Sequence, residues 1–192
     1  MKSFFVFLLI LFSCPLVFAQ QMQKKGCKCS FQSLNQVGLL EGETGSAFQL
    51  QSINGVQYKT WFAGVGTGID YYRFRSVPLF LDIRKDLLKK NFTPFVYSDI
   101  GVHFPWKREG ELHYGDAKFA TGLYYDMGLG LNFATSKNQG FSLRAGYSYK
   151  RIKETSTWSM QCFTYPCYEF RQTRSYGLNR LSMKLGWVFK MK

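Results

Sequence analysis

Apolar and polar residues alternate strictly over two neighbouring stretches in the second half of the chain. Within 122–133 every other residue is apolar, and the residues between them are mostly glycine, aspartate and asparagine. The stretch 141–150 repeats the alternation after the polar segment 136–140. A period of two is the signature of a β-strand. Ordinary strands have about five or six residues, and a strand about twice that long can cross a bilayer at a tilt. The two stretches therefore predict adjacent strands of a transmembrane β-barrel.

Six further stretches with a period of two complete the predicted barrel. The pattern is weakest in the first of them, and they comprise residues 31–41, 46–53, 59–72, 77–84, 92–104 and 177–189. Asn54 and Gly55 predict a tight turn between the second and third strands. The sequence thus predicts an all-β fold, an eight-stranded antiparallel up-and-down transmembrane β-barrel that occupies residues 31–192.

The lengths of the connections predict which end of the barrel faces outward. If the N-terminus starts on the inner side, the outward connections include the two longest, 105–118 and 151–176, while the inward ones are short. Long outer loops and short periplasmic turns are typical of bacterial outer-membrane barrels. Trp61 and Tyr71 share the outward face of the third strand, and we expect them to lie in the two aromatic girdles.

The N-terminus has the pattern of a signal peptide. Lys2 precedes the apolar run 4–12, and Ala19 ends a small-residue cleavage site. We expect residues 1–19 to be removed on export and residues 20–30 to form a periplasmic lead-in. No later stretch is continuously apolar enough for a membrane helix, so the sequence predicts a barrel in the outer membrane of a Gram-negative bacterium.

The chain is strongly basic, with a formal net charge of +13. Export makes nucleic acid an unsuitable partner, and the phosphate-rich surface of lipopolysaccharide is the anionic partner that an exported barrel meets. A generally basic soluble surface is the alternative. We expect a monomer that binds outer-membrane lipids, with an extracellular partner at the outer loops as a further option.

Four cysteines remain in the mature chain. Their even number in an exported protein favours disulfides, and their spacing does not match common zinc sites. We expect residues 151–176 to continue the last two strands as a hairpin, closed by a disulfide between Cys162 and Cys167. The pairing of Cys27 and Cys29 stays open, and no metal or cofactor is expected.

Charged residues recur on the inward face of the predicted strands: Asp70, Asp82, Arg84, Asp99, Asp126, Arg144, Arg180 and Lys184. An eight-stranded barrel is too narrow for an aqueous channel, and an unpaired buried charge costs several kcal/mol. We therefore expect an internal network of salt bridges, with a narrow proton or ion path as the functional alternative. Glycines 64, 66 and 68 are expected to leave room for the inward aromatics Tyr72, Tyr97 and Tyr124.

Four features resemble those of a known group of proteins: the signal peptide, the Asn54–Gly55 turn, the glycine-rich strand that ends Gly68-Ile69-Asp70-Tyr71, and the segment Pro78-Leu79-Phe80-Leu81-Asp82-Ile83-Arg84. This combination resembles the small outer-membrane β-barrel proteins of Bacteroidetes, which are similar in architecture to OmpX- and OmpW-type barrels. The resemblance covers nearly the whole mature chain and implies a location and a fold. It carries no catalytic motif.

Basic and aromatic residues gather in the longest predicted outer loop: Arg151, Lys153, Trp158, Tyr165, Tyr168, Arg171 and Arg174. We interpret them as a surface that contacts lipopolysaccharide phosphates and the membrane interface. Adhesion, ligand capture or the addition of a partner strand is the sharper alternative. In either case the predicted function is surface interaction or envelope integrity.

Two alternatives to a non-enzymatic barrel are open at this point. A lipid-modifying barrel enzyme would need a nucleophile, a base and an orienting acid, and the only histidines are His103 and His113. No serine lies at a telling spacing from either of them. A soluble lipocalin-like carrier would need an apolar interior and a polar exterior, the inverse of the predicted faces.

Overall fold

The computed structural model describes residues 29–43, 45–72, 75–88, 92–106, 116–159 and 169–191. All regular secondary structure of these residues is β-strand: β1 (Cys29–Glu41), β2 (Ala47–Tyr58), β3 (Trp61–Tyr71), β4 (Arg75–Asp86), β5 (Phe92–Pro105), β6 (Asp116–Ala120), β7 (Gly122–Ala134), β8 (Gln139–Ser159) and β9 (Glu169–Met191). No helix in this part of the chain is long and apolar enough to cross a membrane.

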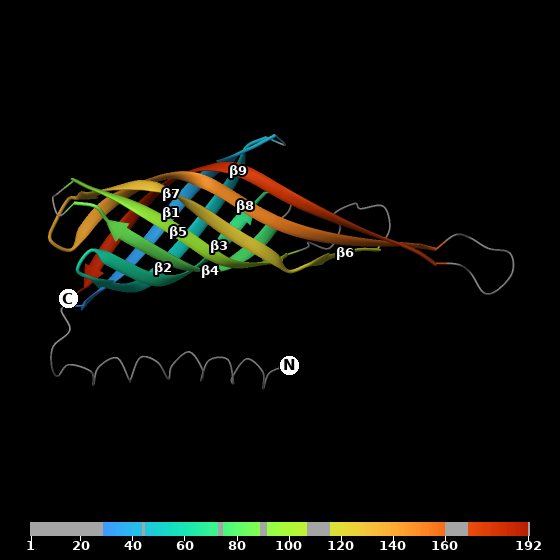
Figure 1. Ribbon diagram of the computed structural model, residues 1–192, viewed down its shortest axis with the longest axis horizontal. Helices are drawn as coiled ribbons and strands as arrows, with labels where there is room; N and C mark the ends of the chain where they lie inside the picture. Colours follow the sequence, from blue (N-terminus) through green and yellow to red (C-terminus); the bar gives the residue numbers. More distant parts are fainter. Residues whose placement is uncertain are drawn as a thin grey trace, which may run out of the picture.

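The strands form one closed antiparallel barrel (Figure 1). Each strand from β1 to β5 pairs with the next along the chain, β5 pairs with β7, and β7, β8 and β9 follow in order. Pairing of β1 with β9 closes the sheet, so no strand within the barrel keeps a free edge. The short strand β6 continues the line of β7, which gives eight staves. The predicted all-β, eight-stranded, up-and-down barrel is confirmed.

The wall of the barrel is apolar and its interior is polar. On β4 the outward side chains of Leu79 and Leu81 are 45% and 59% exposed, whereas the inward Asp82 and Arg84 are 1% and 2% exposed. This alternation follows directly from the period of two in the sequence. A soluble carrier needs the opposite distribution, because water would meet the apolar wall. The structure therefore contradicts the lipocalin-like alternative.

The predicted turn at Asn54–Gly55 is wrong. Strand β2 runs through both residues to Tyr58, and Gly55 lies directly opposite Gly64 of β3. A Cβ at Gly55 would collide with the carbonyl oxygen of Ala63, so this glycine permits close approach of two strands. The chain reverses at Lys59, whose φ of 54° is in the left-handed region.

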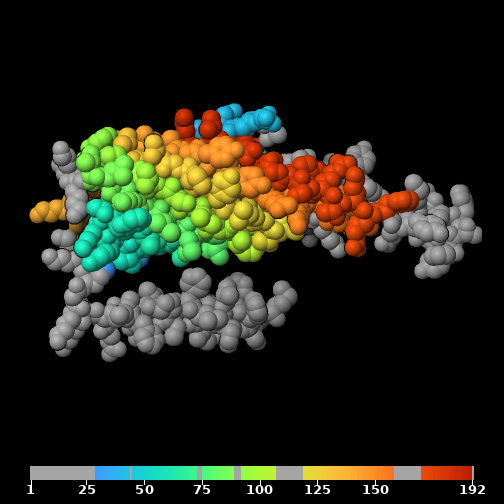
Figure 2. All heavy atoms as spheres, in the orientation of Figure 1, coloured from blue at the N-terminus to red at the C-terminus, as the bar shows by residue number. Residues whose placement is uncertain are grey.

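Strands extend into both of the predicted outer loops. β8 and β9 stay paired from Gln139–Phe189 as far as Ser159–Glu169, and β6 pairs with residues 153–157 of β8. The expected continuation of the last hairpin is confirmed, and β6 adds a third strand to it. Figure 2 shows the orange and red residues of β8 and β9 reaching beyond the body of the barrel. We call β6 and the paired segments 151–159 and 169–177 the projecting sheet.

A β-bulge marks the place where the barrel passes into the projecting sheet. Ala120 pairs with Lys153 and Tyr124 pairs with Lys150, so the strand that leads into β7 holds one residue more than β8 between these pairs. The extra residue interrupts the pairing at Thr121, between β6 and β7. A Cβ on the neighbouring Gly122 would collide with the carbonyl oxygen of Arg151, which explains the need for glycine at this close approach.

Candidate functional site

The middle of the lumen is organised around Arg144. Its Nη2 lies 2.7 Å from Asp82 Oδ2 and its Nη1 lies 3.5 Å from Asp99 Oδ2. Asp82 also accepts a hydrogen bond of 2.7 Å from Arg84 Nε. All these side chains are buried, and β4, β5 and β8 supply them. The cluster therefore ties together strands that are far apart in the sequence.

Lys184 extends this cluster across β9. Its Nζ is 2.7 Å from Asp126 Oδ2 and 3.7 Å from Asp99 Oδ2. Asp126 also accepts hydrogen bonds from the Tyr97 hydroxyl at 2.8 Å and from Ser182 Oγ at 3.2 Å. Within the described residues, the ion pairs of the Asp99 carboxylate are the two longer ones, to Arg144 and to Lys184.

A second ion pair lies nearer the outward end of the lumen. Lys150 Nζ donates to Asp70 Oδ2 and to Ser76 Oγ, and Ser76 Oγ in turn donates to Asp70 Oδ1 at 2.6 Å. The Lys150 ammonium also lies 4.5 Å from the centre of the Tyr72 ring. Lys150 was absent from the predicted network, although it shares the inward parity of Arg144 within the stretch 141–150. Three steps of two residues from Arg144 lead to Lys150 on the same inward face, so the alternation along this strand predicts its position.

Arg180 connects the lumen to the backbone at the outward rim. Its guanidinium donates hydrogen bonds to the carbonyl oxygens of Tyr72 at 2.7 Å, of Leu40 at 3.2 Å and of Gly45. These carbonyl groups belong to the end of β1, to the residue that follows β3 and to the first outer turn. Arg180 therefore braces the connections at the outward rim.

Aromatic side chains fill the space around the ion pairs. Phe80 and Tyr124 are buried and their ring centroids lie 5.4 Å apart. Gly66 makes room for Phe80, and the Tyr97 hydroxyl lies against Gly146. We expected glycines 64, 66 and 68 to make room for Tyr72, Tyr97 and Tyr124. This expectation is wrong about which aromatic side chain lies against which glycine. The lumen as a whole is packed with side chains, as expected for eight strands.

The four lumen aspartates face four basic side chains in these ion pairs. All eight predicted lumen residues lie in the interior. Seven of them form these ion pairs together with Lys150, whereas the eighth, Arg180, binds backbone carbonyl groups at the rim. A buried charge without a partner would be strongly destabilising, so this balance has a direct structural role. The arrangement is that of an internal salt-bridge network that links side chains of different strands across the lumen.

Aromatic and basic side chains alternate at both rims of the outer wall. At the short-turn end Lys85 Nζ lies 5.0 Å from the ring of Trp61. At the other end the Arg75 guanidinium lies 6.0 Å from the ring of Tyr71 and 5.6 Å from that of Trp106. Such pairs place an apolar ring and a cation at one level, as at a membrane–water interface.

A polar cluster lies at the short-turn mouth of the barrel. Gln57 Nε2 donates a hydrogen bond of 2.7 Å to Asp86 Oδ2. Burial raises the pKa of the Asp86 carboxyl, and the charge of Lys190 opposes this shift. The acidic Asp86 and the basic Lys190 thus both lie close to the short turns at this end of the barrel.

The residues of the predicted outer surface are distributed over two faces of the projecting sheet. Lys153 and Thr157 have the parity of the outward wall, and Arg171 lies opposite Thr157. Arg151 shares this face, whereas Arg174 lies opposite Glu154 on the other face. The register pairs Trp158 with Phe170. Tyr165, Tyr168, Cys162 and Cys167 lie outside the described residues, so their predicted roles stay predictions.

His103 is a buried residue of β5. Its Nε2–H donates a hydrogen bond of 2.8 Å to the carbonyl oxygen of Arg151. This bond directs the ring toward the backbone at the base of the projecting sheet. His113 lies outside the described residues. Among the residues that the structure describes, no group of three or more His, Cys, Asp and Glu side chains is arranged to hold a metal ion.

Two solved structures share this architecture. The outer membrane protein OprG from Pseudomonas aeruginosa superposes with a TM-score of 0.62 at 9% sequence identity, over 86% of this chain and 98% of that chain. Neisserial surface protein A (NspA) superposes with a TM-score of 0.55 at 12% identity, over 86% of this chain and 99% of that chain. No protein-family model and no curated protein sequence matches. At these identities the likeness shows the fold, which is that of small outer-membrane barrels.

Proposed function

We propose that this protein is a non-enzymatic outer-membrane barrel, exported from a Gram-negative cell, that binds lipopolysaccharide phosphates through the outward face of its projecting sheet. Two solved outer-membrane barrels with the same fold support the location. The exposed apolar wall supports it independently, because such a wall is stable in a hydrocarbon medium. The rims with paired aromatic rings and cations fit the two membrane interfaces.

The observation that carries the binding role is the position of the cations on the projecting sheet. Arg151, Lys153 and Arg171 continue the outward, lipid-facing side of β8 and β9 beyond the rim. Side chains on that side stand where lipid headgroups surround a barrel. Lysine and arginine next to an anionic membrane surface add favourable electrostatic energy, and this effect weakens with salt. Binding of phosphates there would fix the barrel within the lipid layer and support envelope integrity.

A second role at the surface follows from the edge of β9. Within the described residues, β1 pairs with β9 only from Leu181 onward, and the segment 169–175 of the projecting sheet pairs only with β8. The other backbone edge of this segment is therefore open to an added strand. An extended segment of an extracellular partner could bind there by strand addition.

The proposal of a non-enzymatic role is supported by the engagement of His103. Its Nε2 is committed to the Arg151 carbonyl, and no serine hydroxyl hydrogen-bonds to this ring in the described part of the chain. A hydrolase base needs such a nucleophile within reach. Replacing His103 with Gln is therefore expected to leave the lipid composition of the cells unchanged. Loss of a lipid modification in that variant would favour the enzyme instead.

Neutralising the outward cations tests the binding role directly. The variant R151Q/K153Q/R171Q removes three charges from one face, and the control K59Q/K85Q/K137Q removes three charges at or near the short-turn end. We expect the first variant to bind lipopolysaccharide at least about tenfold more weakly than the parent protein at low salt, and the control to bind as the parent does. Binding is measured with purified barrels in detergent, using intact and dephosphorylated lipopolysaccharide at several salt concentrations.

Two results would contradict the proposal. One is equal binding of the parent protein to intact and dephosphorylated lipopolysaccharide. The other is a parallel loss in both variants, which would mean that total charge decides the affinity. The location is checked separately by cell fractionation and by the difference in gel mobility between unboiled and boiled protein.

A further inference from the structure

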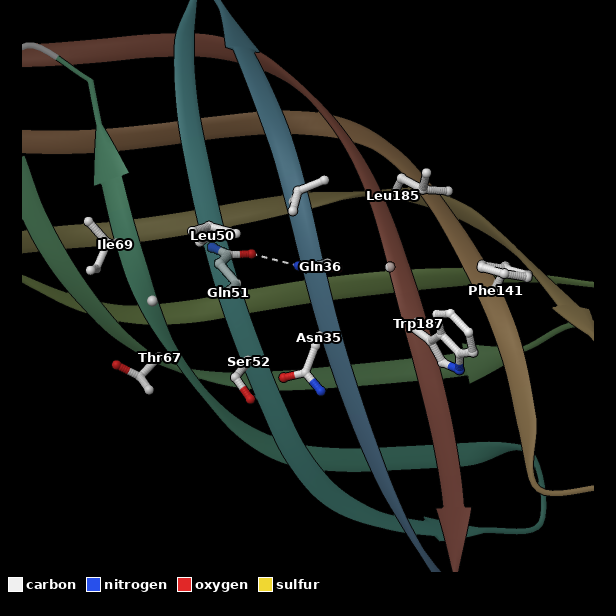
Figure 3. A pocket seen from close by; sticks show the side chains of 13 residues that line it. Asn35, Gln36, Leu50, Gln51, Ser52, Thr67, Ile69, Phe141, Leu185 and Trp187 are labelled. Carbon is white, nitrogen blue, oxygen red and sulfur yellow. Dashed lines mark hydrogen bonds between the residues drawn. The ribbon is translucent and has the colours of Figure 1, made fainter.

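A band of uncharged polar side chains crosses the outward wall of β1, β2 and β3. It consists of Ser33, Asn35, Ser52, Asn54 and Thr67, and we call it the polar band. Its members are neighbours across the strands, because Asn35 lies opposite Ser52, Ser52 opposite Thr67, and Ser33 opposite Asn54. Figure 3 shows three of them, Asn35, Ser52 and Thr67, in one row.

The polar band is confined to one side of the barrel. Between the two rims, the outward positions of β4, β5 and β7 are apolar or aromatic apart from Ser98. Leu81, Ile100 and Leu129 are typical members of that wall and are 55–64% exposed. The five adjacent polar residues on β1, β2 and β3 therefore form a distinct surface.

The polar band lies near the middle of the spanning segments. On β2, Ser52 stands four residues from Phe48 and six from Tyr58, which share its outward face. Thr67 holds the equivalent place on β3. The hydrocarbon core of a bilayer is about 30 Å thick, so lipid headgroups stay well away from this depth. In a lipid bilayer we therefore expect neither water nor phosphate to reach Ser52 and Thr67.

The side chains of the polar band make no hydrogen bond to one another or to other described side chains. None of the five makes a side-chain hydrogen bond with any residue that the structure describes. An amide or hydroxyl left without a hydrogen bond in hydrocarbon is costly. A protein surface that supplies donors and acceptors at the same depth would remove this cost.

The wall is also hollowed along the band. A groove of about 560 Å³ runs over Asn35, Ser52 and Thr67, and Leu50 and Leu185 stand beside it. The row ends at Trp187, which lies opposite Asn35. Small polar side chains between larger apolar ones leave a recess that a second wall can enter, as small residues do at the interfaces of membrane helices.

We propose that the polar band is the surface through which two copies of this chain pair inside the membrane, related by a two-fold axis. The proposal rests on the membrane location proposed above. A two-fold interface brings the same patch of both copies together, so its groups must complement themselves. Asparagine amides and hydroxyls meet this condition because each donates and accepts hydrogen bonds, and the band carries no charge that would repel its copy. A lipid tail would fill the groove without making these bonds. The sequence led us to expect a monomer, and the proposed pairing is the alternative to that expectation.

The association of the full-length protein in lipid bilayers tests the pairing. We compare the parent protein with N35L/N54L, which replaces both amides by side chains suited to the apolar wall, and with S98L as the matched control on the other side of the barrel. Donor- and acceptor-labelled copies are mixed at a series of protein-to-lipid ratios and their energy transfer is measured. We expect the parent to dimerise, N35L/N54L to dimerise at least about tenfold more weakly, and S98L to match the parent.

T67V adds a milder variant, because it removes one hydroxyl and keeps the shape of the side chain. It should weaken the dimer less than N35L/N54L does. A parent protein that stays monomeric at every ratio would overturn the pairing, and so would equal dimerisation of the parent and N35L/N54L. A different protein that purifies with the parent in place of a second copy would overturn it as well.

The failure of this inference is distinguishable from the failure of the proposed function. Each variant is first checked for its presence in the outer-membrane fraction and for the gel shift of a folded barrel. A folded, membrane-located but monomeric protein contradicts only the pairing. A protein that is absent from the outer membrane contradicts the proposed function.

Discussion

Basic side chains occupy two contrasting regions of this molecule. In the lumen, Arg144 is fully buried and its guanidinium lies between the carboxylates of Asp82 and Asp99. On the projecting sheet, Lys153 and Arg171 are exposed. Removal from water makes the lumen cation depend on its carboxylates, whereas an exposed cation remains solvated. The same chemistry therefore serves stability in one region and binding to external anions in the other.

The largest effect on stability is expected for the central lumen cation. Of the ion pairs between described residues, R144M leaves Asp82 the one with Arg84 and leaves Asp99 the longer one with Lys184. Because a buried charge would then be poorly compensated, we expect a loss of about 3–5 kcal/mol in the free energy of unfolding. Urea unfolding of the barrel in lipid vesicles, followed by gel mobility, measures the loss. R144K keeps the charge and should lose less. Equal unfolding midpoints for the parent and R144M would contradict a stabilising role of the Arg144 cluster.

A smaller loss in the free energy of unfolding is expected at the ion pair between Lys150 and Asp70, nearer the outward end of the lumen. K150M removes the cation from Asp70 but keeps the hydrogen bond from Ser76, so we expect a loss of about 1–3 kcal/mol. The double variant K150M/D70N takes away the uncompensated carboxylate and should recover at least half of that loss. The same unfolding experiment gives both values. Additive losses in the double variant would show that the two residues do not interact.

The smallest effect on stability is expected on the projecting sheet. K153Q/R171Q should unfold at the same urea concentration as the parent barrel, because both side chains are exposed and their removal buries no unpaired group. R174Q, on the other face, serves as the control. A clear fall in the midpoint for K153Q/R171Q would mean that these cations hold the sheet together, and the contrast between the two regions would disappear.

Patterns within single strands predicted much of the fold. The two-residue period identified all eight staves and assigned Asp82 and Arg84 to the interior and Leu81 to the wall. These assignments are local, since they depend only on which side of a strand a residue takes. Turns were predicted less well. Asn54–Gly55 has the composition of a tight turn, yet the pairing of β2 with β3 continues through it, and the reversal occurs at Lys59.

The candidate sites depended more strongly on the tertiary structure. The sequence indicated that lumen charges must be paired, but it could not choose Asp82 as the partner of Arg144, 62 residues away. The inward parity of Lys150 could be predicted from the sequence, but its partner Asp70, 80 residues away, could not. The separation of Arg171 from Arg174 onto two faces also required the register between β8 and β9.

The sequence by itself determined the strand class of the fold, the number of staves and the side of each strand that faces outward, because a period of two depends only on neighbouring residues. Only the tertiary structure decided which charges meet, where β6 joins the projecting sheet, and that Asn35, Ser52 and Thr67 form one row. These features depend on strand register. A shift of the register moves every cross-strand neighbour while it leaves the pattern along each strand unchanged.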